Sequence, residues 1–187
     1  MLGLMLFGAG AGLMIESDLG NSPWTVFHQG LSFRFGLTVG VWTMLVAFGV
    51  LLLWIPLGER YGVGTVLNVL IIGPFIDLTT ALVPAPQSIL GRGAMLAAGI
   101  VAVGAASGLY IGAHLGPGPR DGLMTGIAAR GPSLRVTRAA IEITVLAVGW
   151  MLGGRFGIGT IAFAIAIGPL VQFFLPRLEV PGVVSAA

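Results

Sequence analysis

Long apolar runs follow one another along the whole chain, separated by short breaks that contain glycine, proline and isolated charges. An α-helix needs about 20 apolar residues to cross the hydrocarbon core of a bilayer. Six stretches reach or approach this length and are predicted to be transmembrane helices: Met1–Ile15, Thr38–Leu57, Val63–Val83, Gly93–Ala113, Leu134–Leu152 and Ile158–Leu175. The residues at the end of the chain, 177–187, are predicted to form a flexible C-terminal tail.

Two segments are too short to cross a bilayer alone, Ser22–Phe35 and Gly118–Arg130. Each begins with a small residue and a proline, which is a helix-start signal because the N–H that proline lacks would be unpaired there anyway. Both contain polar groups that are unsuited to face lipid. We therefore predict an all-α fold: a polytopic membrane helix bundle of six transmembrane helices plus two short re-entrant or interfacial helices. A count of eight spans stays open as the alternative.

Composition agrees with a membrane protein. Of the 187 residues, 56% are hydrophobic and 9% are charged, whereas a soluble domain carries roughly 25% charged residues. A soluble globule is therefore excluded, and so is a disordered chain. All nine basic residues are arginine and stand singly between apolar runs, so no nucleic-acid partner is predicted. Cysteine is absent, which excludes disulfides and thiolate metal sites.

The two halves of the chain resemble each other. The matching pairs include Gly8 with Gly104, Gly12 with Gly108, Leu19–Pro23 with Leu115–Pro119 and, after a slip of one residue, Gly58–Thr65 with Gly153–Thr160 and Ile72–Pro74 with Ile167–Pro169. We infer an internal repeat with a first half over 1–87 and a second half over 88–176. Each half holds three spans and one short helix.

Three spans per half place the halves in opposite orientations, a 3+3 inverted repeat of the kind found in many secondary transporters. Six arginines then collect on the N-terminal side against three on the other, which predicts a cytoplasmic N-terminus. Eight spans would give a parallel repeat with the same six-to-three split. Arg92 opens the fourth span, and its matching position falls upstream of Met1, so the first span looks shortened.

The paired breaks carry a resemblance to a known family. The motifs are Leu19–Ser32 and Gly62–Thr65 with Ile76–Leu78 in the first half, then Gly118–Met124, Glu142 and Gly157–Thr160 in the second. With these motifs the chain resembles the YczE/YyaS/YitT group of bacterial membrane proteins, nearest the YczE branch. The resemblance implies a polytopic bacterial inner-membrane protein. Members of the group are sometimes described as permease-like, and some are linked to secondary-metabolite production.

One position departs from the family's pattern. Thr25 stands where family members often carry an acid after the Pro-Trp pair, and only the second copy has its acid, Asp121. The resemblance therefore does not imply a site with two symmetric carboxylates in this chain.

The N-termini of the two short helices are the first candidates for binding. A helix N-terminus presents unpaired N–H groups and about half a positive charge, and two of them near the membrane middle would favour an anion or polar solute. Arg120 would strengthen the site for a carboxylate or phosphate. The predicted substrate-binding residues are Ser22, Thr25, His28, Gln29, Arg120, Asp121, Thr125 and Glu142. The alternative is that Ser22 and Gly118 simply cap interfacial helices.

Further polar residues within the spans are predicted to be structural or gating residues. Arg138 and Glu142 are four apart, which places them on one helix face as an ion pair, although an intramembrane acid can also serve a cavity. Asp77 and Gln172 each follow a Gly-Pro pair, at Pro74 and Pro169, where a broken helix frees carbonyls. A kink near the membrane surface is the alternative.

Two smaller patterns predict local structure. Thr65 and Thr160 follow Gly-x-Gly and are predicted to be N-caps. The Gly8/Gly12 and Gly104/Gly108 pairs allow close approach of helices, so the first and fourth spans are predicted to pack together. A homodimer contact is the alternative for these glycines.

These features predict a permease for a small polar or anionic solute that binds between the repeats. A non-transporting scaffold for another pathway is the alternative. No enzyme activity, metal site or cofactor is predicted, because the two histidines have no acid pair at ligand spacing and no intramembrane catalytic signature is present. The expected partners are the bilayer, a small solute and a second copy in a homodimer.

Overall fold

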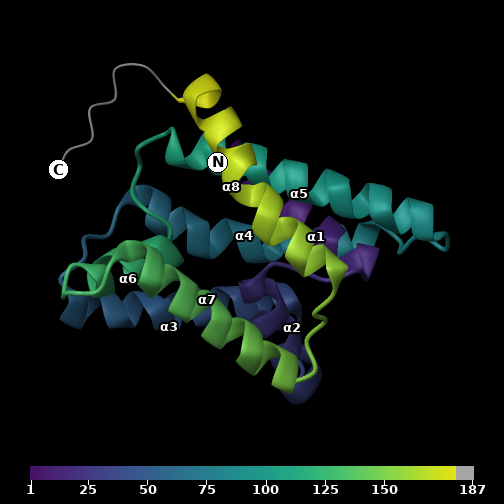
Figure 1. The fold of residues 1–187 in the computed structure, drawn as a ribbon, viewed down its shortest axis with the longest axis horizontal. Helices are drawn as coiled ribbons and strands as arrows, with labels where there is room; N and C mark the ends of the chain where they lie inside the picture. The colour runs from purple at the N-terminus through teal and green to yellow at the C-terminus, as the bar shows by residue number, and fades with distance from the viewer. Residues whose placement is uncertain (180–187) are drawn as a thin grey trace.

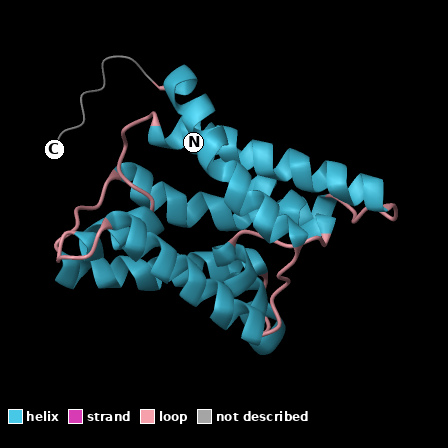
Figure 2. Ribbon diagram, viewed as in Figure 1, coloured by secondary structure: helices cyan, strands magenta, loops and turns pink. Residues whose placement is uncertain are grey.

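A computed structural model describes residues 1–179 as eight α-helices joined by short loops, with no strand in this range (Figures 1 and 2). The helices are α1 (Leu2–Ser17), α2 (Pro23–Phe35), α3 (Val39–Leu57), α4 (Val63–Leu82), α5 (Ile89–Ile111), α6 (Pro119–Ala128), α7 (Leu134–Met151) and α8 (Ile158–Leu178). The predicted all-α class is confirmed.

Three helices extend beyond their predicted ends, and α1 does so by two residues, to Ser17. α5 begins at Ile89 rather than Gly93, because the Ser88 hydroxyl caps it by accepting the Gly91 N–H at 3.1 Å. α8 continues through Leu178, two residues into the segment predicted as a tail. Residues 180–187 of that segment lie outside the described residues.

Four helices are long and apolar enough to cross a membrane: α3, α4, α5 and α8. The two other predicted spans are less clear cases. α1 has only 16 residues, and α7 carries three charges within 18 residues, on Arg135, Arg138 and Glu142. The fold is therefore that of a multi-helix membrane protein whose described part includes four helices of spanning character.

α1 and α5 pack against each other and form the central pair in a row of four helices. On the outer sides, α4 packs on α1 and α8 packs on α5, while α2 packs on α7 and α6 packs on α3 (Figure 1). The predicted contact of the first and fourth spans is thus present.

That central contact uses other glycines than the predicted ones. A Cβ on Gly10 would lie 2.9 Å from the Gly99 carbonyl, so these two glycines let α1 and α5 approach. Gly8 and Gly12 instead face α4, and Gly104 and Gly108 face α8. The predicted glycine pairs therefore serve packing within each half of the chain, and Gly10 and Gly99 allow the contact between the halves.

The loops after α1 and α5 are held in the same way. The Gly159 N–H donates to the Leu19 carbonyl, and the Gly64 N–H donates to the Leu115 carbonyl, both at 2.8 Å. The glycine after each carbonyl, Gly20 or Gly116, has φ of 114°, a backbone conformation that side chains disfavour. Each short helix is thereby anchored to the start of a long helix in the other half.

The structure corrects the prediction for Thr65 and Thr160. Each is the third residue of its helix, after N-caps Gly62 and Gly157, and each hydroxyl accepts the N–H of its N-cap glycine, at 3.2 and 3.4 Å. This is the half of a capping box in which the side chain of the third helical residue accepts the backbone N–H of the N-cap residue.

Candidate functional site

A cavity of about 520 Å³ lies at the centre of the molecule, where the N-termini of α2 and α6 meet. Ser22, Pro23 and Trp24 line it from α2, and Gly118, Pro119 and Arg120 line it from α6. These are matching positions of the two short segments. The other walls come from α1, α3, α4, α5, α7 and α8.

Local contacts fix both helix starts. The Ser22 hydroxyl accepts the Thr25 N–H at 3.3 Å and lies 2.8 Å from the Thr25 hydroxyl. α6 is held by Trp54 of α3, which is fully buried and whose indole N–H donates to the Pro119 carbonyl at 3.0 Å. Both helices therefore direct the positive end of their dipole at the cavity.

Arg120 is the cation nearest these helix ends. Its guanidinium carbon lies 4.9 Å from the centre of the Trp24 ring, in a cation–π contact that joins α6 to α2. Within residues 1–179, no carboxylate forms an ion pair with Arg120. The guanidinium donors are therefore available to a ligand.

The two carboxylates of the cavity already have partners. Asp121 accepts the Tyr110 hydroxyl at 3.0 Å. Glu142 accepts Nε of Arg138 at 3.1 Å, which is the ion pair predicted from their spacing. Neither acid neutralises Arg120 directly.

Trp24 supplies a second donor that has no partner within the described part of the protein. Its side chain is only 6% exposed, lines the cavity, and has an indole N–H with no hydrogen-bond partner. A buried polar group without a partner is costly. The groups that await a partner in this cavity are thus donors, which suits an anion or another hydrogen-bond acceptor.

The structure brings some of the predicted binding residues together and separates others. Four line the central cavity: Ser22, Arg120, Asp121 and Glu142. Arg138 and Gln172, predicted as structural or gating residues, line it too. The remaining candidates, Thr25, His28, Gln29 and Thr125, do not.

Those four residues have other neighbours. Nδ1 of His28 lies 2.9 Å from the Thr43 hydroxyl inside the α2–α3 contact. The Thr125 hydroxyl donates to Glu59 at 3.1 Å on the surface. The sequence alone cannot show which polar residues of α2 face the cavity. This helix of 13 residues carries polar side chains on several faces, and only its start lines the cavity.

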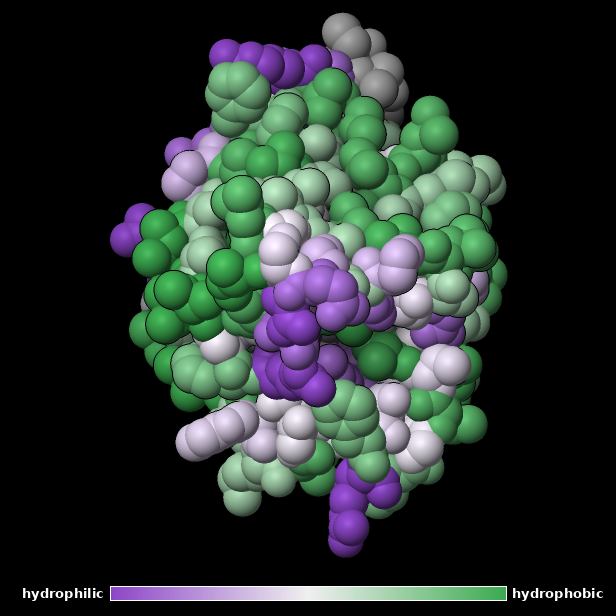
Figure 3. Space-filling model, turned by 90° about the vertical axis from the view of Figure 1, so that its right-hand side faces the viewer, coloured by the Kyte–Doolittle hydropathy of each residue, from purple (hydrophilic) through white to green (hydrophobic). Residues whose placement is uncertain are grey.

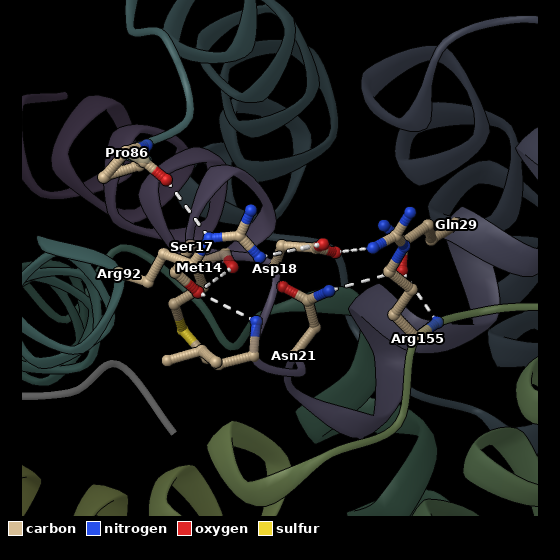
Figure 4. A network of polar contacts seen from close by, with 9 residues as sticks. Met14, Ser17, Asp18, Asn21, Gln29, Pro86, Arg92 and Arg155 are labelled. Carbon is tan, nitrogen blue, oxygen red and sulfur yellow. Dashed lines mark hydrogen bonds and ion pairs between the residues drawn. The ribbon is translucent and has the colours of Figure 1, made fainter. Parts of the chain in front are cut away.

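A second hollow, of about 660 Å³, lies at the end of the molecule where α5 begins. Asp18 joins three segments there, because it pairs with Arg92 at 3.3 Å and also with Arg155 (Figure 4). Gln29 accepts the backbone N–H of Arg155 at 2.9 Å and the amide of Asn21 at 3.3 Å. Figure 3 shows a hydrophilic patch on this face, surrounded by hydrophobic side chains.

Asp77 lines this second hollow and has a structural role. Its carboxylate accepts the Thr38 hydroxyl at 2.5 Å and the Gly40 N–H at 2.8 Å, so it caps the start of α3. The two Gly-Pro prolines, Pro74 and Pro169, lie inside α4 and α8. Gln172, the sequence match of Asp77, makes no such contact and is exposed.

No group of three or more metal-ligating side chains occurs among the residues described. Trp24, Tyr110 and Asn68 also line the central cavity, although none of them is among the binding residues predicted from the sequence. For Trp24 a signal was available, since it directly follows the proline that begins α2.

A protein-family model matches residues 1–176, nearly the whole chain, and describes a family of unknown function, DUF6198. The chain belongs to the DUF6198 family. It is also similar to the uncharacterized membrane protein YczE of Bacillus subtilis, with 38% identity over 180 residues that cover 94% of this chain and 83% of the relative.

Two further relatives agree with this placement. An uncharacterized protein of Haemophilus influenzae is 42% identical over 176 residues, which cover 94% of this chain and 81% of the relative. The uncharacterized protein YyaS of Bacillus subtilis is 28% identical over 185 residues, covering 95% and 91%. No solved structure matches the chain. The predicted resemblance to the YczE-like family is confirmed, and with it the assignment to membrane proteins.

Proposed function

We propose that this DUF6198 protein is a bacterial inner-membrane permease for a small polar or anionic solute, which binds in the central cavity. The observation that carries the proposal is the set of available donors there: the Arg120 guanidinium, the Trp24 indole N–H and the two helix N-termini. A cavity of about 520 Å³ has the size of an ordinary small-molecule site.

The arrangement of the chain supports the proposed inverted repeat of three spans per half. The paired bonds to Leu19 and Leu115 and the equal φ of Gly20 and Gly116 relate the halves locally. α2 begins at the central cavity, yet Ser32 near its end lines the same hollow as Asp18 after α1. This favours a re-entrant α2 and hence six spans. The six-to-three split of the arginines then favours an N-terminus in the cytoplasm.

The proposal predicts that Arg120 is required for binding. We expect inorganic phosphate or a short carboxylate such as butanoate to raise the unfolding temperature of the purified protein, since a ligand at 100 times its dissociation constant adds about 2.7 kcal/mol to stability. Arg120→Ala should lose this response and the uptake of the same anion by proteoliposomes, while remaining folded.

Arg34→Ala is the matched control, because Arg34 is exposed at the far end of α2. It should respond like the wild type. If no anion in the panel stabilises the wild-type protein, or if Arg120→Ala responds equally, the anion site is absent. The alternative function, a non-transporting scaffold for another pathway, is then favoured. Binding without uptake would retain the site but contradict the permease.

A further inference from the structure

The central cavity has an opening on one side, between α7 and α8. In the first half of the chain, α3 and α4 pack together, and a Cβ on Gly73 would lie 2.7 Å from the Met44 side chain. The matching residue of α8, Gly168, has nothing within 4 Å of a Cβ position. Figure 1 shows α7 and α8 diverging from the loop that joins them.

A difference between the halves explains the opening. The second residue of α3 is Gly40, whose Cβ position is already filled by the Gly73 carbonyl and the Asp77 carboxylate. The second residue of α7 is Arg135. A side chain of that size cannot enter so close a contact, so α7 cannot pack on α8 as α3 packs on α4.

The two sides of this opening differ in character. α8 contributes the apolar residues Phe163, Ala164, Ile167 and Val171 together with Gln172, whereas α7 contributes only the Arg138–Glu142 ion pair. Neighbouring side chains of α8 that point outward are apolar and strongly exposed, such as Ile165 at 71%. Exposed apolar residues on a membrane helix face lipid, so the α8 side of the opening offers an alkyl chain a mainly apolar wall towards the bilayer, while the α7 side is polar.

We infer that the ligand is an amphipathic anion, a carboxylate or phosphate with a single alkyl chain, which reaches the cavity from the bilayer. Its headgroup binds to Arg120 and Trp24, and its chain lies along α8 and passes Gly168 between α7 and α8. This inference rests on the proposed anion site and names its substrate class. The cavity volume of about 520 Å³ suits one chain with a small headgroup.

Gly168→Leu tests the path of the chain. We expect this variant to bind dodecanoate about ten-fold or more weakly than the wild type, because leucine fills the space of the chain, and to bind butanoate unchanged. The measurement is the concentration-dependent shift in unfolding temperature of the full-length protein in phosphatidylcholine nanodiscs. Ala164→Leu, on the same wall of the cavity, gives a second variant should Gly168→Leu fail to fold.

Gly49→Leu is the matched control. Gly49 lies on α3, also has nothing within 4 Å of a Cβ position, and does not line the cavity. It should leave both affinities unchanged. The inference is overturned if Gly168→Leu binds dodecanoate like the wild type, if it weakens butanoate equally, or if Gly49→Leu has the same effect.

The two proposals fail in distinguishable ways. Unchanged dodecanoate binding in Gly168→Leu, with butanoate still lost in Arg120→Ala, retains the anion site but removes the lipid-side path. Loss of neither ligand in Arg120→Ala removes the anion site and this inference together. If Gly168→Leu instead dissociates a dimer in native mass spectrometry, a second copy covers the opening and the inference is wrong.

Discussion

Single residues show how equivalent positions have acquired different roles. Asp77 and Gln172 occupy the same place after a Gly-Pro pair, but only Asp77 caps a helix of its own half, through Thr38 and the Gly40 N–H. The carboxylate can do so because α3 lies against α4, while α7 lies away from Gln172.

Asp77→Ala should therefore lower the stability of the protein by about 1–2 kcal/mol, the usual cost of a lost N-terminal cap. Gln172→Ala, at the matching position, should change stability by less than about 0.5 kcal/mol. Unfolding in detergent followed by circular dichroism measures both. Equal losses in the two variants would contradict the structural role assigned to Asp77.

At the scale of whole helices, α1 is a short element held by glycine contacts on two faces. Gly10 faces α5, and Gly8 and Gly12 face α4. A helix of 16 residues gains its position from this close packing, because dispersion contacts replace the hydrophobic effect between helices in lipid.

Gly8→Ala should destabilise the protein by about 1–3 kcal/mol, since the added Cβ would lie 2.6 Å from the Phe75 Cβ and the helices would have to separate. Gly49→Ala, with open space at its Cβ, should cause no loss. Thermal unfolding of the two variants under one condition makes the comparison. A stable Gly8→Ala would show that α1 and α4 are less tightly packed than described.

The helices could be predicted from the sequence, because glycine, proline and charged residues mark where each apolar run begins and ends. It also located the helix starts at Pro23 and Pro119 and the Arg138–Glu142 pair, all of which are local patterns. It did not distinguish the cavity from the surface. Ser22 and Gln29 are both polar and are seven residues apart, yet Ser22 lines the central cavity and Gln29 lines the second hollow. The reason is that the other walls of each hollow come from helices that are distant in the sequence.

At the scale of the whole molecule, the two ends differ in polar contacts. Asp18, Arg92 and Arg155 form ion pairs at one end. At the other end, the Thr125 hydroxyl of α6 donates to Glu59, which follows α3. Under the proposed six-span topology, these ends face opposite sides of the membrane, with the Asp18 end outside.

Cysteine scanning tests this topology, because the chain has no cysteine of its own. Arg34→Cys should react with a membrane-impermeant maleimide added to intact cells, and Arg60→Cys should react only after the cells are opened. Eight spans would reverse the two results. Such a reversal would remove the inverted repeat, and with it the argument for a permease.

Arg135, which stands where the first half has Gly40, also bears on how such a protein could move. In a carrier with inverted halves, each half can adopt the conformation of the other. This gives two states that are related by a two-fold axis in the membrane plane and are similar in energy. Here the second half cannot adopt the shape of the first without burying an arginine in a contact made for glycine. The two states would be unequal in energy, and the protein would rest in one orientation, returning to it after each cycle.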